Sequence, residues 1–186
     1  MTLAVVALGA NLPFAGRSPE DNLRLVMLDL QALPCSRVLA HSRLWQSAPV
    51  KAEGPVFLNA CSLLETELAP LALLDSLLAL ETRWGRVRSH DKRPALAPAR
   101  SLDLDLIWME GFESCTDQLQ LPHPRASSRS FVLGPLRDLT PWFSKPLALP
   151  HPVTNSPWRI EELWQALPES QRAESQPLTP VVEQAA

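Results

Sequence analysis

The stretch Ser101-Leu102-Asp103-Leu104-Asp105-Leu106-Ile107-Trp108 alternates acidic residues with leucines inside an apolar run. Because strand side chains alternate between two faces, this pattern predicts a strand with Asp103 and Asp105 on one face and the leucines on the other. Two carboxylates about 7 Å apart on a half-buried face repel each other unless a cation lies beside them. Oxygen ligands suit Mg²⁺, which proteins usually bind through one or two carboxylates together with substrate phosphates. The stretch therefore predicts a strand of a sheet and a magnesium site for a nucleotide.

The sequence on either side of this strand predicts the rest of the sheet. Apolar runs predict three further strands, and apolar residues at helical spacing predict three helices. The expected order through the acidic strand is strand–helix–strand–strand–helix–strand, which is typical of a ferredoxin-like, split βαβ sandwich. We therefore expect an α+β fold with a mainly antiparallel sheet and helices packed on one of its faces. The expected strands cover residues 3–8, 38–46, 56–67 and the acidic stretch, and the helices cover residues 19–33, 70–84 and 127–139.

Composition limits the class of protein. With 186 residues, the chain is expected to form one domain over residues 1–165 and a flexible tail over residues 166–186. The formal net charge of −3 provides no basic field, so we expect no nucleic-acid partner. No apolar run approaches the ~18 residues that span a membrane, and no signal peptide is evident at the N-terminus. The three cysteines are widely spaced and lack metal-ligand spacing, which indicates reduced thiols. We therefore expect a cytoplasmic protein with no membrane partner.

Arginines lie on both sides of the loop that precedes the acidic strand. Arg86 and Arg88 begin this loop and Arg100 ends it. The guanidinium group is planar, always charged and suited to phosphate oxygens. A cationic loop beside a carboxylate pair predicts binding of a triphosphate, although a charged loop taken alone is usually a solvated one. Glu81 stands out in the helix before the loop because it lies on the apolar stripe.

Two more groups of residues carry possible chemistry. His123 lies between two prolines, which fix the backbone around it, and Arg129 follows near a predicted helix start. Phe57 and Asn59 share one strand face, where, together with Phe131, they suit stacking against a flat ring and reading of its edge. The plainer alternatives are a surface histidine and a core phenylalanine beside a satisfied asparagine.

Taken in order, these motifs resemble the 6-hydroxymethyl-7,8-dihydropterin pyrophosphokinases of folate biosynthesis. The resemblance covers about residues 3–145, whereas neither a GxxxxGK[ST] phosphate loop nor a GxGxxG fingerprint is present. The residues that carry it lie in the segments 8–12, 47–49, 57–60, 80–88, 100–105 and 121–136.

The resemblance implies transfer of pyrophosphate from ATP to the hydroxymethyl group of 6-hydroxymethyl-7,8-dihydropterin, with release of AMP, by a monomer. It implies that Asp103 and Asp105 bind two Mg²⁺ ions, and that Arg86 and Arg100 stabilise the transferred group. The residues implied to bind ATP are Glu81, Arg88, Leu106, His123 and Arg129. The residues implied to bind the pterin are Ser47, Ala48, Pro49, Phe57, Asn59 and Phe131.

Two other classes of protein remain as alternatives. The segment Ala97-Pro98-Ala99-Arg100 stands where the family usually has Trp-Gly-Pro-Arg, and the loop before it is longer. A catalytically weak paralogue that only binds pterin or nucleotide is therefore one alternative. The other is a ferredoxin-like interaction module whose acidic residues are solvated.

Overall fold

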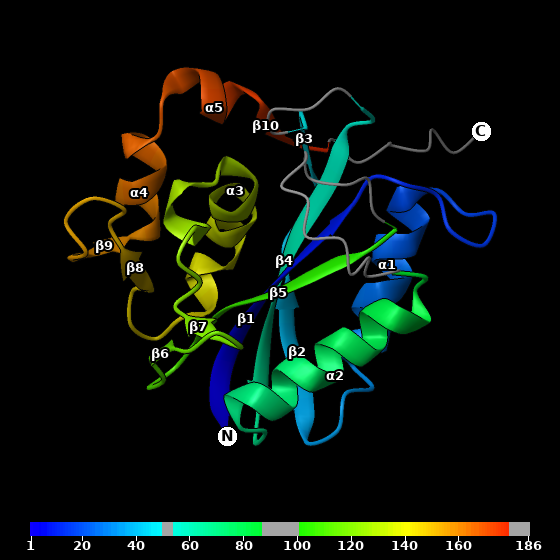
Figure 1. Cartoon of the computed structure of the whole chain (residues 1–186). Helices are drawn as coiled ribbons and strands as arrows, with labels where there is room; N and C mark the ends of the chain where they lie inside the picture. Colours follow the sequence, from blue (N-terminus) through cyan, green and yellow to red (C-terminus); the bar gives the residue numbers. More distant parts are fainter. Residues whose placement is uncertain (50–53, 87–100, 179–186) are drawn as a thin grey trace.

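The computed structural model describes residues 1–49, 54–86 and 101–178 (Figure 1). Within these residues, six strands form one antiparallel sheet in the order β10-β3-β4-β1-β5, and β2 pairs with β4 beside β3. Two short hairpins lie outside it. The strands of the sheet are β1 (Thr2–Ala10), β2 (Ser36–His41), β3 (Trp45–Ser47), β4 (Phe57–Thr66), β5 (Asp103–Met109) and β10 (Ser175–Pro177). The hairpins pair β6 (Ser114–Cys115) with β7 (Gln120–Leu121) and β8 (Ala148–Pro150) with β9 (Pro157–Arg159).

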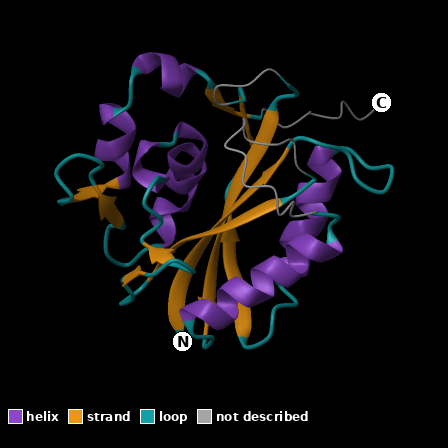
Figure 2. Cartoon of the chain, viewed as in Figure 1, coloured by secondary structure: helices purple, strands orange, loops and turns teal. Residues whose placement is uncertain are grey.

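Helices cover both faces of the sheet (Figure 2). On one face lie α1 (Pro19–Leu30) and α2 (Pro70–Arg83), and on the other lie α3 (Ser130–Leu139) and α4 (Ile160–Ala166). A short helix, α5 (Glu169–Ala173), leads into β10, and two 3₁₀ turns, η1 (Ala126–Ser128) and η2 (Thr140–Trp142), flank α3. None of the helices described here is long and apolar enough to cross a lipid bilayer.

The central strands are apolar on both sides because each side packs against a layer of helices. In β4, Ala60 and Leu64 are buried under α1 and α2, whereas Cys61 and Leu63 are buried under α3. In β5, the leucines lie on the α1–α2 side and Ile107 lies on the α3 side. Strand alternation then places Asp103 and Asp105 on the α3 side as well. The two helical layers thus decide which face of the sheet carries the acidic pair.

The α+β class with a mainly antiparallel sheet is confirmed, and so is the helix start at Ser18. The Ser18 Oγ accepts a hydrogen bond from the Asp21 N–H at 3.1 Å, and Pro19 occupies the first turn of α1. The prediction that all helices share one face is wrong, since α3 packs on the opposite face from α1 and α2. Apolar spacing reports that a helix is amphipathic, but it does not report which face of the sheet the helix covers.

The strand predicted over residues 38–46 is interrupted. Ser42 lies between β2 and β3, where its Oγ accepts the Cys61 N–H at 2.8 Å and donates to the Arg43 carbonyl oxygen at 2.7 Å. The side chain of Ser42 thus replaces a backbone partner, and the chain leaves the ladder for three residues. One apolar run therefore yields two strands.

The ordered part of the chain extends beyond the predicted boundary at residue 165. Residues 169–177 form α5 and β10, and the Leu178 N–H donates to the Leu44 carbonyl oxygen at 2.8 Å. The first part of the tail expected over residues 166–186 therefore contains a helix and a strand that pairs with β3. The rest of that tail, from residue 179, lies outside the described residues.

Replacement of Gly134 by alanine tests how closely α3 packs on the sheet. A Cβ at Gly134 would lie 2.8 Å from two ring carbons of Trp45. Alanine favours a helix over glycine by about 1 kcal/mol, but overpacking of a core usually costs about 1–3 kcal/mol. We expect Gly134→Ala to lower the free energy of unfolding by about 1 kcal/mol in urea titrations. In a Trp45→Phe background, which removes the contacted ring carbons, the same substitution should cost less. Equal or higher stability of Gly134→Ala in the otherwise unchanged chain would contradict this packing.

The stability of the protein is expected to depend on pH through His41. Burial lowers the pKa of His41 below its ordinary value of 6.5, and its Nδ1 lies 2.8 Å from the Ser62 Oγ. Below pH 6.5 the unfolded chain therefore binds a proton at this histidine more readily than the folded chain, so the free energy of unfolding falls as the pH decreases. Urea titrations between pH 7.5 and pH 5 should show this loss, and His41→Gln should flatten it. An unchanged slope in His41→Gln would assign the pH dependence to other groups.

Candidate active site

The two aspartates lie at the start of β5, on the face that α3 covers further along the strand. The side chains of Asp103 and Asp105 are 24% and 41% exposed, so both carboxylates reach solvent from a strand whose other face is buried. No group of three or more His, Cys, Asp or Glu side chains with metal-binding geometry occurs in the part of the chain that the structure describes. The donor set is thus a carboxylate pair, which is the set that Mg²⁺ commonly shares with phosphate oxygens and water.

A glycine leaves space beside this pair. Gly9 of β1 pairs with Asp103 of β5 on one side and with Asn59 of β4 on the other. A Cβ at Gly9 would lie 3.9 Å from the Asp103 Cβ and 3.6 Å from the Asn59 Oδ1. The absence of a side chain therefore keeps open the surface between the carboxylate and the amide. This open surface beside Asp103 fits a bound cation and the group that it would contact.

Glu81, near the end of α2, is almost completely buried and contacts β5. Its Oε1 accepts the Leu104 N–H at 2.7 Å, and Arg86 forms ion pairs with both Glu81 and Asp103. Gly85, with a φ of +78°, follows the end of α2 and turns the chain so that the Arg86 N–H donates to the Glu81 carbonyl oxygen. The buried acid on the apolar stripe thus has a structural reason: it positions a strand backbone and an arginine.

Loop 122–129 approaches β5 from its open side. The His123 N–H donates to the Ile107 carbonyl oxygen at 2.8 Å, which places His123 near Asp105. Burial lowers the pKa of His123; the charge of Asp105 opposes this effect, and those of Arg129 and Arg125 add to it. The Nδ1 of His123 lies 3.2 Å from the Arg125 N–H and accepts its hydrogen bond, so the ring proton of the neutral histidine is on Nε2.

A cavity of about 390 Å³ lies where this loop meets β5. Asp105, Leu106 and His123 line it, so three of the predicted site residues share one recess. Arg129 lies beside it, with its guanidinium nitrogen 3.9 Å from the Asp105 Oδ2. The recess carries the carboxylates of Asp105 and Asp117, the His123 imidazole and an apolar wall, and it suits a nucleotide whose phosphates reach Asp105 through a bound cation. The other lining residues are Leu74, Asp117, Gln118, Leu119, Gln120, Pro124 and Arg125.

Three of the residues predicted to bind a flat ring, Ser47, Phe57 and Asn59, lie on strands across Gly9 from Asp103. The Asn59 Nδ2 donates to the Ser47 Oγ at 2.9 Å, and both side chains are buried. Phe57 pairs with Ser47 across the β3–β4 ladder, and half-buried Phe131 lies in the first turn of α3. The Arg129 guanidinium lies 5.3 Å from the Phe131 ring centroid, a cation–π distance. Of the remaining predicted residues, Ala48 and Pro49 directly follow β3, whereas Arg88 and Arg100 lie outside the described residues.

Comparison with known proteins identifies this arrangement. The model of the 7,8-dihydro-6-hydroxymethylpterin-pyrophosphokinase (HPPK) family matches residues 5–141, which include both aspartates and all the other predicted site residues. The chain belongs to the HPPK family. It is accordingly a pterin pyrophosphokinase, an enzyme of folate biosynthesis that transfers pyrophosphate from ATP to hydroxymethyldihydropterin.

Curated relatives agree with the HPPK model. The chain is 39% identical over 137 residues to a 2-amino-4-hydroxy-6-hydroxymethyldihydropteridine pyrophosphokinase from Pseudomonas aeruginosa, in an alignment that covers 73% of this chain and 79% of that protein. It is 34% identical over 142 residues to the enzyme of the same name from Methylorubrum extorquens, covering 76% and 84% of the two chains.

Solved HPPK structures share the fold. An HPPK-DHPS crystallised with substrates superimposes with a TM-score of 0.64 at 11% identity, over 96% of this chain and 48% of that one. Wild-type HPPK-DHPS from Plasmodium falciparum gives a TM-score of 0.59 at 13% identity, over 88% and 44% of the two chains. The chain thus spans about half the length of these structures.

Some residues of the recess beside Asp105 could not be found from sequence motifs. Leu74, Asp117 and Leu119 line the recess beside Asp105, yet they come from α2 and from the β6–β7 turn. Leu74 could be found only as an apolar residue of its helix, and Asp117 carries no signal because its position depends on how the hairpin folds back.

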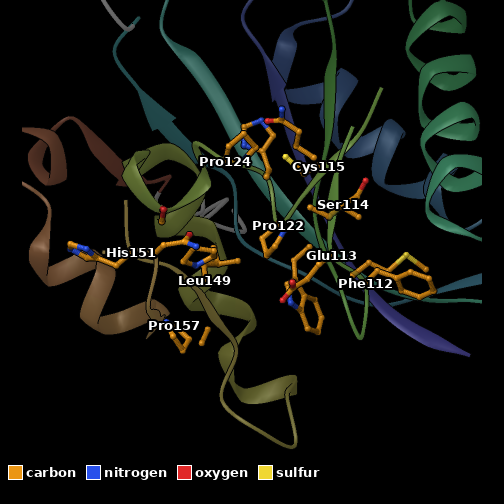
Figure 3. A pocket seen from close by; sticks show the side chains of 18 of the residues that line it. Phe112, Glu113, Ser114, Cys115, Pro122, Pro124, Leu149, His151 and Pro157 are labelled. Carbon is orange, nitrogen blue, oxygen red and sulfur yellow. The ribbon is translucent and has the colours of Figure 1, made fainter. Parts of the chain in front are cut away.

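A second, larger cavity is lined by none of the residues predicted to bind a flat ring. It has a volume of about 890 Å³ and lies between the β6–β7 and β8–β9 hairpins (Figure 3). Both copies of the string Leu-Pro-His-Pro, at residues 121–124 and 149–152, line it. Among the described residues predicted for the site, His123 alone reaches this cavity. Its walls are mainly aromatic, proline and small polar side chains.

Proposed function

We propose that the HPPK reaction takes place across the Asp103–Asp105 pair, with ATP on one side of the pair and the pterin on the other. One observation carries this assignment: Asp103 lies next to Gly9 and Asn59, whereas Asp105 lines the recess with Leu106 and His123. The acidic pair therefore lies between two groups of side chains of different chemistry. One group offers aromatic rings and an amide, and the other, at the recess, offers a histidine and an apolar wall beside arginines.

Asp103 and Asp105 would hold the two Mg²⁺ ions, because their carboxylates are partly exposed and Gly9 leaves room beside them. When bound, Mg²⁺ neutralises phosphate charge and orients the phosphates for an in-line displacement. The ATP phosphates would bring four negative charges next to this acidic pair. Cations on both sides of the pair are thus the feature that such a substrate requires.

The cationic side chains divide into two sets. Arg86, held by Glu81 and Asp103, lies on the α2 side of the pair and would donate to the oxygens of the transferred pyrophosphoryl group. Arg129 and His123 lie on the loop side and would bind the phosphates of ATP. His123 donates from Nε2 without needing a charge, since its Nδ1 accepts the Arg125 N–H. Arg88 and Arg100 are proposed to join the Arg86 set.

The pterin would lie between Phe57 and Phe131, with its polar edge toward Asn59 and the backbone at residues 47–49. The Asn59 amide is oriented by its hydrogen bond to the Ser47 Oγ, so its Oδ1 is available to accept from a ring N–H. This orientation directs the hydroxymethyl group toward Asp103. The hydroxymethyl oxygen would then release its proton to solvent and bond to the β-phosphorus of ATP, as the bond between that phosphorus and the α-phosphate oxygen breaks and AMP leaves.

The first test is formation of AMP by the purified chain. ATP, Mg²⁺ and 6-hydroxymethyl-7,8-dihydropterin are incubated with the protein, and nucleotides are separated by chromatography. We expect AMP in amounts equal to the pyrophosphorylated pterin, and none when the pterin is omitted. Binding of ATP or pterin without AMP would instead support the paralogue that binds but does not catalyse. We further propose that the enzyme is a monomer in the cytoplasm. Gel filtration of the same preparation tests the monomeric state.

A further inference from the structure

The last strand of the sheet lies beyond residue 141, where the family match ends. β10 extends the sheet next to β3, with Ser175 opposite Ser47 and Pro177 opposite Trp45 (Figure 1). α5 precedes this strand, and the Gln176 Nε2 donates back to the Arg172 and Ala173 carbonyl oxygens. The strand is therefore attached both to the sheet and to its own preceding helix.

The side chain of Ser175 reaches a second element. It is 1% exposed, and its Oγ lies 2.7 Å from the Oγ of buried Ser130. Ser130 is the first residue of α3 and lies between Arg129 and Phe131. One residue thus contacts β3 through its backbone and α3 through its hydroxyl group.

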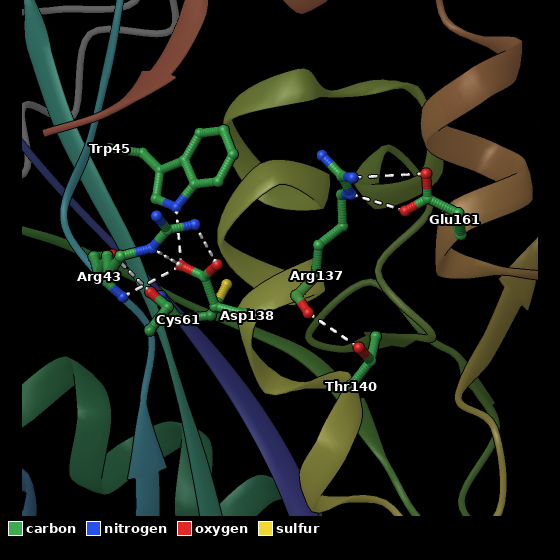
Figure 4. A network of polar contacts seen from close by, with 8 residues as sticks. Arg43, Trp45, Cys61, Arg137, Asp138, Thr140 and Glu161 are labelled. Atoms are coloured by element: carbon green, nitrogen blue, oxygen red, sulfur yellow. Dashed lines mark hydrogen bonds and ion pairs between the residues drawn. The ribbon is translucent and has the colours of Figure 1, made fainter. Parts of the chain in front are cut away.

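The other end of α3 is attached to β3 by different contacts (Figure 4). Asp138 accepts hydrogen bonds from the Arg43 guanidinium at 2.7 and 3.2 Å and from the Trp45 Nε1 at 3.0 Å. Burial by itself would raise the pKa of Asp138, but these hydrogen bonds outweigh it and keep the pKa below its ordinary value. Gly134 lets the middle of the helix touch the Trp45 ring. The Ser130–Ser175 contact is thus located at the N-terminal end of α3, next to Phe131.

β10 also pairs with the strand that carries Ser47, the residue that orients the Asn59 amide. Ser47, which is opposite Ser175, accepts the hydrogen bond from the Asn59 Nδ2. Phe131 follows Ser130 in α3, and Asn59 lies in the β3–β4 ladder, so a shift of the start of α3 relative to this ladder would move the Phe131 ring relative to the Asn59 amide. Ser175 bridges the two elements there, whereas the Asp138 contacts lie more than one helical turn away.

We propose that Ser175 is a positioning residue for the pterin, and that β10 completes the pterin side of the active site. This inference rests on the proposed function, in which Phe131 and Asn59 contact the pterin. Ser175 does not touch the substrate; it fixes the separation of the two side chains that do. Loss of its hydroxyl group should therefore affect pterin binding and leave the ATP recess, on the other side of the acidic pair, unchanged.

The test compares Ser175→Ala with Ser170→Ala, which removes an exposed hydroxyl group from α5 in the same segment. Calorimetry measures the Kd of the pterin in the presence of Mg²⁺ and a non-hydrolysable ATP analogue, and separately the Kd of the analogue. Loss of one buried hydrogen bond corresponds to about a 3- to 10-fold weakening of pterin binding. The analogue should bind Ser175→Ala as it binds the wild type, and Ser170→Ala should match the wild type for both ligands.

Ser130→Ala removes the other hydroxyl group of the Ser130–Ser175 hydrogen bond. It replaces Ser175→Ala in the test if that variant does not fold. The variant with both substitutions should bind the pterin as strongly as the single variant that has the lower pterin affinity. Both substitutions remove the same hydrogen bond, so their effects should not add. Unchanged pterin affinity in Ser175→Ala, or equal weakening of pterin and analogue together with a lower Tm, would overturn the positioning role alone. A wild-type chain without pterin-dependent AMP would overturn the proposed function and this inference with it.

Discussion

Asp105→Ala is expected to reduce the rate of pterin-dependent AMP formation by at least about 10³-fold, the scale of losing a principal electrostatic contact in a transition state. Asp105 lies between Asp103 and the recess with His123, where the phosphates of ATP would bind. Without its carboxylate, only Asp103 remains on this face of β5 to hold Mg²⁺. The phosphate charge would then be neutralised less completely, and the reacting groups would be aligned less well.

The same substitution should leave the fold intact. The Asp105 side chain is 41% exposed, and its removal relieves the repulsion between two negative charges on one strand face. We expect a Tm equal to or slightly above that of the wild type, measured by circular dichroism, with the rate measured on the same preparation. Asp75→Ala, an exposed acid on the outer surface of α2, is the matched control and should retain full activity. An Asp105→Ala enzyme with more than a tenth of the wild-type rate would remove this residue from the catalytic group.

Glu81→Leu is expected to lower the free energy of unfolding by about 3 kcal/mol, since removal of one partner from a buried ion pair typically costs about 3–5 kcal/mol. The substitution leaves the Leu104 N–H without its carboxylate acceptor and Arg86 without its buried anion. The rate should fall as well, by about 10²-fold, because Arg86 loses the contact that directs it toward Asp103.

Two variants separate the effects of charge and shape. Glu81→Gln keeps an oxygen for the Leu104 N–H, so it should restore much of the stability while the rate stays low. Glu20→Leu removes an acid from the exposed pair with Arg24 and should change stability by less than about 0.5 kcal/mol. Urea unfolding and initial rates of AMP formation supply both readouts. If Glu81→Leu unfolds at the wild-type urea concentration, the carboxylate is not needed at the contact between α2 and β5.

The sequence alone predicts those parts of the fold whose periodicity reports burial directly. The alternation in β5 correctly separates the aspartates from the leucines, because the strand is apolar on one face and acidic at one end of the other. The helical stripe of α2 similarly marks Glu81 as buried. The partner of Glu81 could not be predicted, since it is a backbone N–H of Leu104 and any residue type offers the same group.

The parts that could not be predicted depend on tertiary contacts. β10 consists of Ser-Gln-Pro, a polar segment without apolar alternation, and it is a strand because β3 and Ser130 offer partners. The break at Ser42 depends on a hydrogen bond to Cys61, which is distant in sequence. For the site, motif residues could be chosen from sequence, whereas the recess formed with the β6–β7 hairpin required the folded chain.

The outer side of β5 has a consequence for the behaviour of the protein at high concentration. β5 is an edge strand of the sheet, and such a strand can template pairing with another chain and start aggregation. Here the Glu81 carboxylate accepts a hydrogen bond from the Leu104 N–H, and the His123 N–H donates one to the Ile107 carbonyl oxygen. The residues that organise the active site therefore also block the exposed strand, so that mutations that loosen the site also favour self-association.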